Sequence, residues 1–510
     1  MRRSVGLGLL MTLACPLVVA GQGVPAADSL AKAASAASAA NTVAINFVWT
    51  LVAGFLVMFM QAGFAMVETG FTRAKNAAHT ITMNFMVYGI AMLAYWAIGF
   101  AFQAGGVGPL GTLGGYDKLA HEISITIAGK EWGLFGGTGF FLTGVAYTAP
   151  VFAYFLFQMV FMDTAATIPT GALAERWKFS AFAVFSVFVG AFIYPIYANW
   201  TWGGGWLAML GKNLGLGHGH VDFAGSSVVH MTGGVMAFVA AALLGPRRGK
   251  YNADGSVNAI PGHNIPMALI GTFILAFGWF GFNAGSTLAG SDLRIGVIAT
   301  NTMLAGAAGG ITSMLYMWFK YGKPDPSMMA NGTLAGLVAI TAPCAFVTAP
   351  SAVLIGGIAG VLVCVAVFFI DGKLRIDDPV GAISVHGVNG LWGILALGLL
   401  ADGTYGDGWN GVNGAVRGLF YGDASQFAAQ LIGGVANLVG VGAMAFVAYK
   451  VTAFVVGGHR VAPEVEELGL DLPEMGALAY PDSPEVASAV ILSETASRGV
   501  GHLEPEPEAV

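Results

Sequence analysis

DFAGSSVVHMTGG, residues 222–234, places a histidine, His230, inside an otherwise apolar segment. A second stretch, DDPVGAISVHGVNG, residues 377–390, does the same with His386. In each stretch an aspartate, Asp222 or Asp378, lies eight residues before the histidine. Ionisable side chains are costly within a membrane span, so each histidine marks a candidate functional site. Two such histidines in matching settings predict a duplicated unit that contributes one histidine from each half.

The composition of the chain is typical of a membrane protein. Of its 510 residues, 56% are hydrophobic and 10% are charged, against about 25% charged in soluble proteins. Many apolar runs reach the roughly 20 residues that a helix needs to cross a bilayer. The 75 glycines indicate closely packed helices. A net charge of −6 with scattered basic residues indicates no nucleic-acid partner. The cysteines form no disulfide pattern.

Residues 1–26 are predicted to be a secretory signal peptide. Arg2 and Arg3 precede a short apolar run that ends in small residues, with cleavage after Ala20 or Ala26. Cys15 gives a weaker match to a lipoprotein site. Residues 27–42 are rich in Ala and Ser and are expected to be a loose segment.

Eleven membrane-spanning helices are predicted within residues 43–456, followed by a tail at 457–510. The acidic end of this tail, residues 481–510, is expected to be disordered. The predicted spans cover residues 43–68, 79–102, 137–166, 180–200, 223–244, 264–286, 292–318, 328–347, 351–370, 381–401 and 427–455.

The distribution of basic residues predicts the orientation of these spans. Odd-numbered connections carry eleven Lys and Arg residues and even-numbered connections carry five. Cytoplasmic loops are enriched in Lys and Arg. The N-terminus is therefore expected outside and the tail in the cytoplasm, which agrees with the signal peptide.

The spans also indicate an internal repeat. Spans one and six carry similar motifs around Gln61 and Asn283, and spans five and ten carry His230 and His386. Because five is an odd number, the second half must be inverted relative to the first. Inverted repeats place a substrate path at their interface near the middle of the membrane. The eleventh span is expected to brace the bundle.

The histidines have two interpretations. Each can bond to a helix carbonyl and fill space, or the two can share one N–H···N bond and still offer a donor and an acceptor to a small polar solute. We favour the second because both lie in equivalent places of a duplicated fold. No Cys, Glu or third His lies at a spacing that predicts a metal site.

The other candidates each have a structural alternative. Asp222 and Asp378 can act as helix N-caps. Trp202, in the sequence WGGGW, can belong to an interfacial aromatic belt or form a cation–π surface. Three phenylalanines can each face lipid or the core when taken singly: Phe157, Phe161 and Phe282. Ser286 lies one helical turn after Phe282, so its hydroxyl and that ring share a helix face.

Several further ionisable residues are not part of this set. Glu68 and Glu175 lie beside Arg73 and Arg176, where structural ion pairs are expected. His218 and His220 are expected to be solvated in an external loop. Asp163 lies deep in a predicted span and has no assigned role. If its side chain faced the pore, the path through the protein would not be wholly apolar.

Six motifs together resemble ammonium transporters of the Amt/Mep/Rh family, specifically the bacterial Amt type. The resemblance covers residues 43–480. The motifs are ETGFTRAKN (68–76), GALAERWKFS (171–180), WGGGW (202–206), DFAGSSVVHMTGG (222–234), GWFGFNAGS (278–286) and DDPVGAISVHGVNGLWG (377–393).

The resemblance implies an all-α membrane fold of eleven helices with an inverted five-plus-five repeat, assembled as a homotrimer in the bacterial inner membrane. The segment 460–480 resembles one that docks on the cytoplasmic face and helps to meet a PII signalling protein. The implied site residues are an external ammonium recruitment site (Phe157, Phe161, Trp202, Ser286 and Asp222), a Phe gate (Phe161 and Phe282), a pore histidine pair (His230 and His386) and a pore-adjacent Thr341.

The expected function is selective ammonium transport. Ammonium is expected to bind at the recruitment site, and ammonia to pass the Phe gate and the histidine pair, with or without its proton. The alternatives are an ammonium sensor on the same fold and a channel for another small neutral gas. An enzyme is not expected, because no nucleophilic serine motif or metal-ligand set is present, and no cofactor is expected.

Overall fold

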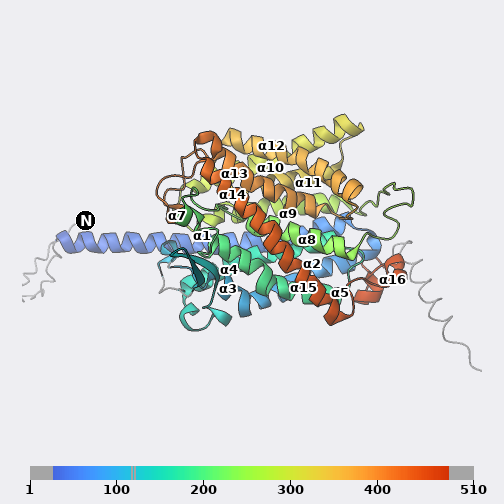
Figure 1. Ribbon diagram of the computed structural model, residues 1–510, viewed down its shortest axis with the longest axis horizontal. Helices are drawn as coiled ribbons and strands as arrows, with labels where there is room; N and C mark the ends of the chain where they lie inside the picture. The colour runs from blue at the N-terminus through green and yellow to red at the C-terminus, as the bar shows by residue number, and fades with distance from the viewer. Residues whose placement is uncertain (1–26, 109, 116–118, 120–121, 482–510) are drawn as a thin grey trace, which may run out of the picture. The chain divides into compact units, whose positions relative to one another are not determined.

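The computed structural model describes residues 27–108, 110–115, 119 and 122–481. The predicted signal peptide, the Cys15 lipoprotein match and residues 482–510 of the tail lie outside the described residues. The described part of the chain is mostly helical (Figure 1).

The helices are α1 (Ala27–Phe71), α2 (Ala77–Ala94), α3 (Phe100–Ala104), α4 (Ala149–Leu173), α5 (Phe179–Phe188), α6 (Tyr194–Trp202), α7 (Leu210–Leu214), α8 (Thr232–Leu244), α9 (Ile265–Phe282), α10 (Arg294–Tyr321), α11 (Pro326–Ile340), α12 (Ala349–Phe369), α13 (Asn389–Leu400), α14 (Ala424–Ala436), α15 (Gly442–Val456) and α16 (Pro463–Leu468). Short π-helical or 3-10 segments extend several of them, among them η2 (Tyr95–Gly99), η6 (Val189–Ile193), η7 (Ser226–Met231), η8 (Ala284–Thr287), η9 (Ile370–Leu374), η10 (Ile383–Val388) and η13 (Asn437–Val441).

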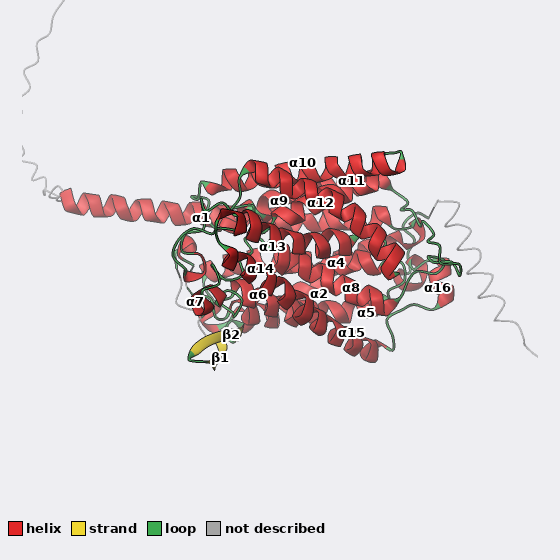
Figure 2. Ribbon diagram, turned by 45° about the horizontal axis from the view of Figure 1, so that its top comes forward, coloured by secondary structure: helices red, strands yellow, loops and turns green. Residues whose placement is uncertain are grey.

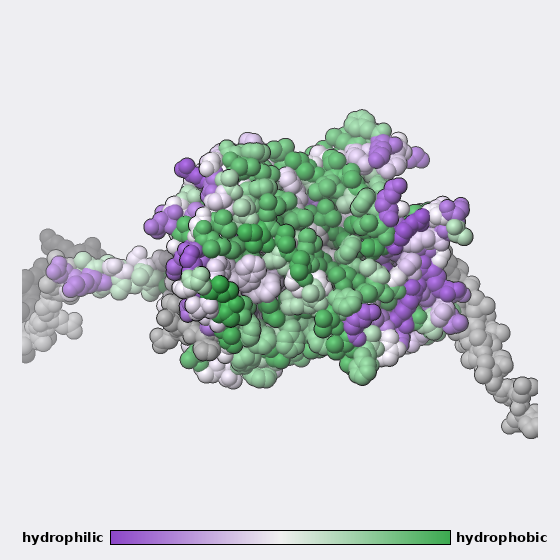
Figure 3. Space-filling view, in the orientation of Figure 1, coloured by the Kyte–Doolittle hydropathy of each residue, from purple (hydrophilic) through white to green (hydrophobic). Residues whose placement is uncertain are grey.

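The described residues contain 10 helical segments that are long and apolar enough to cross a membrane. The predicted eighth span corresponds to α11, an apolar helix of 15 residues, so its crossing stays a prediction. Large apolar side chains point away from the protein on these helices: Phe273, Phe319 and Phe454 are 78%, 84% and 90% exposed. On the face in Figure 3, hydrophobic residues cover the middle and hydrophilic residues gather towards the helix ends. This multi-pass protein presents an apolar belt to lipid.

The third predicted span, 137–166, is wrong at its start. The helix α4 begins at Ala149, because Gly139, Phe141, Leu142 and Gly144 adopt positive φ angles that an α-helix does not allow. A β-hairpin precedes this loop and was not predicted. Its strands β1 (Glu122–Ile127) and β2 (Lys130–Gly136) pair in antiparallel fashion (Figure 2).

Residues 27–42 are helical rather than loose. They form the start of α1, and their alanine-rich sequence favours a helix even though the side chains of residues 28–42 are exposed. The described residues divide into two units between Thr42 and Val43. The division between the membrane domain and the tail at residue 457 stays a prediction.

Glycines let the helices approach closely. A methyl group on Gly63 of α1 would lie 3.0 Å from the carbonyl oxygen of Gly271 on α9. On α12, a methyl group on Gly356 would lie 2.1 Å from the carbonyl oxygen of Ala305 on α10. The helices α10, α11 and α12 accordingly pack side by side (Figures 1 and 2). The high glycine content therefore serves helix packing in the membrane.

Candidate functional site

The two histidines of the matching stretches meet in the core. His230 lies on η7 and His386 on η10, and their Nδ1 atoms are 3.2 Å apart. The ring centroids are 5.2 Å apart and the ring planes differ by 23°. Both residues are buried, and the Nε2 atom of His230 has no hydrogen-bond partner among the described residues. The pair can share one N–H···N bond and still leave a ring nitrogen for a solute.

Each aspartate that precedes a histidine holds the start of its helix. The carboxylate of Asp222 accepts hydrogen bonds from the backbone N–H groups of residues 225–228 at 2.7–2.9 Å. Asp378 accepts from the N–H groups of Gly381 and Ile383 at 3.0 and 2.7 Å. The capping interpretation is confirmed for both, because free N–H groups at a helix start favour a carboxylate.

A column of aromatic rings leads to the histidine pair. Phe161 and Phe282 stack with centroids 4.1 Å apart and planes that differ by 22°. The ring of His230 stacks on Phe282 at 5.3 Å. Beyond the pair, the ring of Phe64 lies 5.9 Å from that of His386.

Trp279 is a neighbour of the pair that sequence reasoning missed. Its ring stacks on His230 at 5.3 Å, and its Nε1–H donates to Thr341 Oγ1 at 3.0 Å. Thr341 therefore reaches the histidines through Trp279. The motif GWFGFNAGS contains Trp279, but nothing in its spacing separates this ring from Phe280, which lies next to it in the sequence.

A cavity of about 190 Å³, the outer cavity, lies at one end of this column. Phe157, Phe161, Trp202 and Ser286 all line it. Asp222 does not; its carbonyl oxygen accepts a hydrogen bond from Trp202 Nε1 at 2.7 Å, behind the cavity. Ser286 Oγ donates to the carbonyl of Phe282 at 2.7 Å, so its lone pairs can accept from a solute.

A smaller cavity of about 20 Å³, the inner cavity, lies beyond His386 near the end of α1 and the start of η10. It shares no lining residue with the outer cavity. Three of its lining residues are polar and the others are apolar. The polar ones are Glu68, Asn331 and His386.

Comparisons with known proteins show the family of the chain. A sequence profile of the Ammonium Transporter Family matches residues 48–480. The chain belongs to this family. Ammonium transporter Amt2 of Archaeoglobus fulgidus is 48% identical over 441 residues, 86% of this chain and 88% of the relative. Ammonium transporter Amt1 of Haloferax mediterranei is 38% identical, over 87% and 81% of the two chains.

Solved structures show the same fold. A structure described as a sensor Amt protein superimposes with a TM-score of 0.73 at 36% identity, over 85% of this chain and 99% of that one. Mep2 of Saccharomyces cerevisiae gives a TM-score of 0.68 at 26% identity, over 82% and 88% of the two chains. The Amt/Mep fold expected from the motifs is confirmed.

The prediction that Glu68 and Glu175 form structural ion pairs is only partly correct. Glu175 pairs with Arg73 and with Arg247. Glu68 pairs with no arginine among the described residues, and instead accepts from Asn84 and Thr170. Its position one turn before the end of α1 points it inward between α2 and α4 rather than to the surface.

His218 and His220 are buried, so the expectation that they are solvated is wrong. Gln426 and Gln430 of α14 bind the backbone of residues 218–221 and hold the loop inward. Burial lowers the pKa of His220 to about 4, although the charge of Asp222 acts in the opposite direction. The ring is therefore neutral, and it bonds to Ser227 Oγ at 2.9 Å.

Asp163 is buried in α4, and its Oδ1 atom has no hydrogen-bond partner among the described residues. It lines neither the outer nor the inner cavity. The described residues also hold no group of three or more His, Cys, Asp or Glu that could bind a metal ion.

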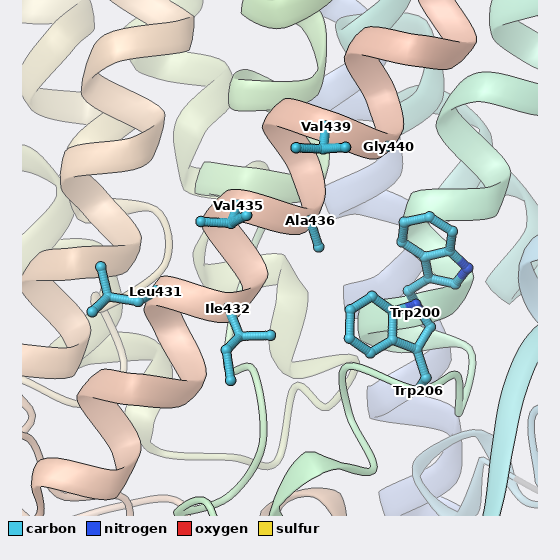
Figure 4. Close-up of a pocket in the computed structure, with 8 residues that line it drawn as sticks. All are labelled: Trp200, Trp206, Leu431, Ile432, Val435, Ala436, Val439 and Gly440. Atoms are coloured by element: carbon cyan, nitrogen blue, oxygen red, sulfur yellow. The ribbon is translucent and has the colours of Figure 1, made fainter. Parts of the chain in front are cut away.

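The transporter also has a larger apolar groove of about 520 Å³, away from the aromatic column. In Figure 4, apolar side chains of α14 and η13 face the indole rings of Trp200 and Trp206. Leu431, Ile432, Val435 and Val439 offer no group that can hold a small polar solute. The groove therefore lies outside the candidate site.

Proposed function

We propose that this protein recruits ammonium at the outer cavity and conducts ammonia past Phe161 and Phe282 to His230 and His386. The observation that carries the proposal is the continuous order of outer cavity, stacked rings, histidine pair and inner cavity. Membership in the Ammonium Transporter Family supports the choice of solute.

The chemistry of the outer cavity suits ammonium. The ion carries one charge and four N–H donors. Ring faces attract a cation by about 0.5–2 kcal/mol, depending on desolvation, and the Ser286 hydroxyl can accept one N–H. A large hydrated cation gains less, because ring faces cannot replace its water.

The stacked rings favour loss of the proton. Carrying an ion between two buried phenyl rings costs several kcal/mol without a partner charge. Neutral ammonia avoids this cost, and the histidine pair can relay the separated proton. Potassium has no proton to lose, so the same barrier excludes it.

The wider setting belongs to the same proposal. We place the protein in a bacterial inner membrane with the N-terminus outside, supported by the excess of basic residues at one end of the spans. The homotrimer and a PII signalling protein at the cytoplasmic face follow from the resemblance. The tail lies against the starts of α2 and α5, because Asp471 accepts from the N–H of His79 and Glu474 from that of Phe179.

The test is an ammonium-jump current in proteoliposomes, with potassium as the control ion. We expect current with ammonium and none with potassium, and no selective conduction by His230→Ala. His79→Ala is the matched control, because His79 is a buried span histidine that lines neither cavity.

Unchanged uptake and selectivity in His230→Ala would contradict the relay. An internal pH change without current would mean that ammonia crosses and its proton stays behind. If neither signal is found, the transport proposal fails and the sensor alternative takes its place.

A further inference from the structure

The inner cavity contains an ionisable group that the proposed pathway does not yet use. Glu68 lines it together with His386. The cavity volume of about 20 Å³ exceeds the roughly 10–15 Å³ that one water needs, and ammonia has a similar size. A single ammonia molecule that has passed His386 can therefore lie beside this carboxyl group.

Neighbouring residues hold the carboxyl group in place. Its Oε2 atom accepts from Asn84 Nδ2 at 2.6 Å and from Thr170 Oγ1 at 2.7 Å. A methyl group on Gly171 of α4 would lie 2.9 Å from Oε1 and would displace the carboxyl group. The network continues from Asn84 to Gln61, because Thr167 Oγ1 donates to Asn84 Oδ1 at 2.8 Å and accepts from Gln61 Nε2 at 3.0 Å. The group is thus oriented by α2 and α4.

A structural role alone does not require an acid at this position. Glutamine has the same size and also offers an oxygen to Asn84 and Thr170. An ionisable side chain within a membrane span is costly and marks proton or substrate paths. The side chain of Glu68 is 3% exposed and has no arginine or lysine partner among the described residues.

We propose that Glu68 returns a proton to ammonia in the inner cavity. The carboxylic acid O–H bond breaks, an N–H bond forms at the ammonia lone pair, and ammonium leaves towards the cytoplasm from a carboxylate. The carboxylate then regains the proton that the His230–His386 pair has relayed from the incoming ammonium. One ammonium enters and one leaves. This step rests on the proposed function.

The other titratable groups near Glu68 have different roles. Asp378 is close enough to act on it electrostatically, but its carboxylate caps η10 and does not line the inner cavity. His386 lines the cavity and bonds to His230. The bonded partners from α2 and α4, Asn84 and Thr170, carry no charge.

The test compares Glu68→Gln with Glu68→Asp in proteoliposomes, by ammonium-jump current at several internal pH values and by thermal melting. Glu68→Gln removes the proton donor and keeps the size of the side chain. Glu68→Asp keeps the proton donor and shortens the side chain. General acid catalysis contributes about 10²–10⁴-fold, so we expect the Gln current to fall at least about tenfold and to lose its dependence on internal pH. The Asp variant should retain more current than Gln despite a lower melting temperature.

Thr170→Val is the control, because it removes one of the two hydrogen bonds to Glu68 Oε2 and leaves the carboxyl group. It should melt earlier than wild type and keep the dependence on internal pH. A Gln variant as active as wild type, or more active than Asp, overturns the role of Glu68 while the proposed function stands. A wild-type protein without any ammonium response overturns the proposed function itself.

Discussion

Asp222 accepts five hydrogen bonds, four from backbone N–H groups and one from Ser227 Oγ at 2.7 Å. It is buried, and the backbone that it holds leads directly into η7 and His230. Its negative charge also lies behind Trp202, whose indole N–H bonds to the Asp222 carbonyl. This one side chain therefore links the histidine pair to the outer cavity through local geometry.

Asp222→Ala should destabilise the protein strongly. It leaves several buried N–H groups without a partner, and each unsatisfied group costs about 1–3 kcal/mol. Asp423→Ala is the matched control, because Asp423 caps α14 at a partly exposed position where a lost cap costs about 1 kcal/mol. The melting temperatures of Asp222→Ala and Asp423→Ala in detergent measure the two losses of stability. An equal fall in melting temperature would contradict the special role of Asp222.

The histidines of η7 and η10 come together because the backbone of α8, which continues η7, lies very close to that of η10. A methyl group on Gly234, one turn after His230, would lie 2.2 Å from the backbone nitrogen of Gly387. Glycine at this crossing lets α8 approach η10 closely enough for the 3.2 Å contact between the Nδ1 atoms. The small residues after each histidine are therefore part of the site.

Gly234→Ala should separate the two elements and abolish ammonium conduction, although both histidines remain. The added methyl group meets backbone rather than a flexible side chain, so the helices must shift. Gly357→Ala on α12 is the control, since its methyl group would meet Thr312 Cγ2 at an ordinary 3.5 Å. Ammonium-jump currents of the two variants provide the measurement, and retained current in Gly234→Ala would contradict the prediction.

At the scale of the whole molecule, a buried ion network joins the two halves. Arg247 bonds to Asp377 and Glu175, and Arg176 donates to the Asp377 carbonyl at 2.7 Å. The tail joins the same region, because Glu466 accepts from the N–H of Arg248 at 2.7 Å. Burial alone would raise the pKa of Asp377, but the charges of Arg176 and Arg247 outweigh it and hold that pKa well below its usual range.

Asp377→Asn should cost about 3–5 kcal/mol near neutral pH, because it leaves a buried arginine without its partner. A depressed pKa stabilises the folded state above the ordinary carboxyl pKa, and this contribution is lost as pH falls below about 4. The wild type should therefore lose stability on acidification more steeply than Asp377→Asn. Thermal melting between pH 7 and pH 3.5 checks this, and parallel pH profiles would contradict it.

Much of the site could be predicted because its residues come from motifs. The histidine pair, the rings of Phe161 and Phe282, and the cavity residue Trp202 meet as the duplicated pattern and the family resemblance predicted. Trp279 could not be selected, since an aromatic residue in a span fits lipid, core or pore equally well. Glu68 was expected to pair with a nearby arginine, but it bonds to Asn84 and Thr170. Residues that are close in sequence at the end of a helix need not be close in space.

By itself, the sequence determined the membrane class, the helical fold and the family, because hydropathy, motif order and the paired Asp–His spacing are properties of the chain. Only the tertiary structure decided the start of α4, the inward fold of the loop around His220, and the two separate cavities. These features depend on backbone angles and on contacts between residues that are distant in the sequence. Such contacts are set by packing, and no local pattern encodes them.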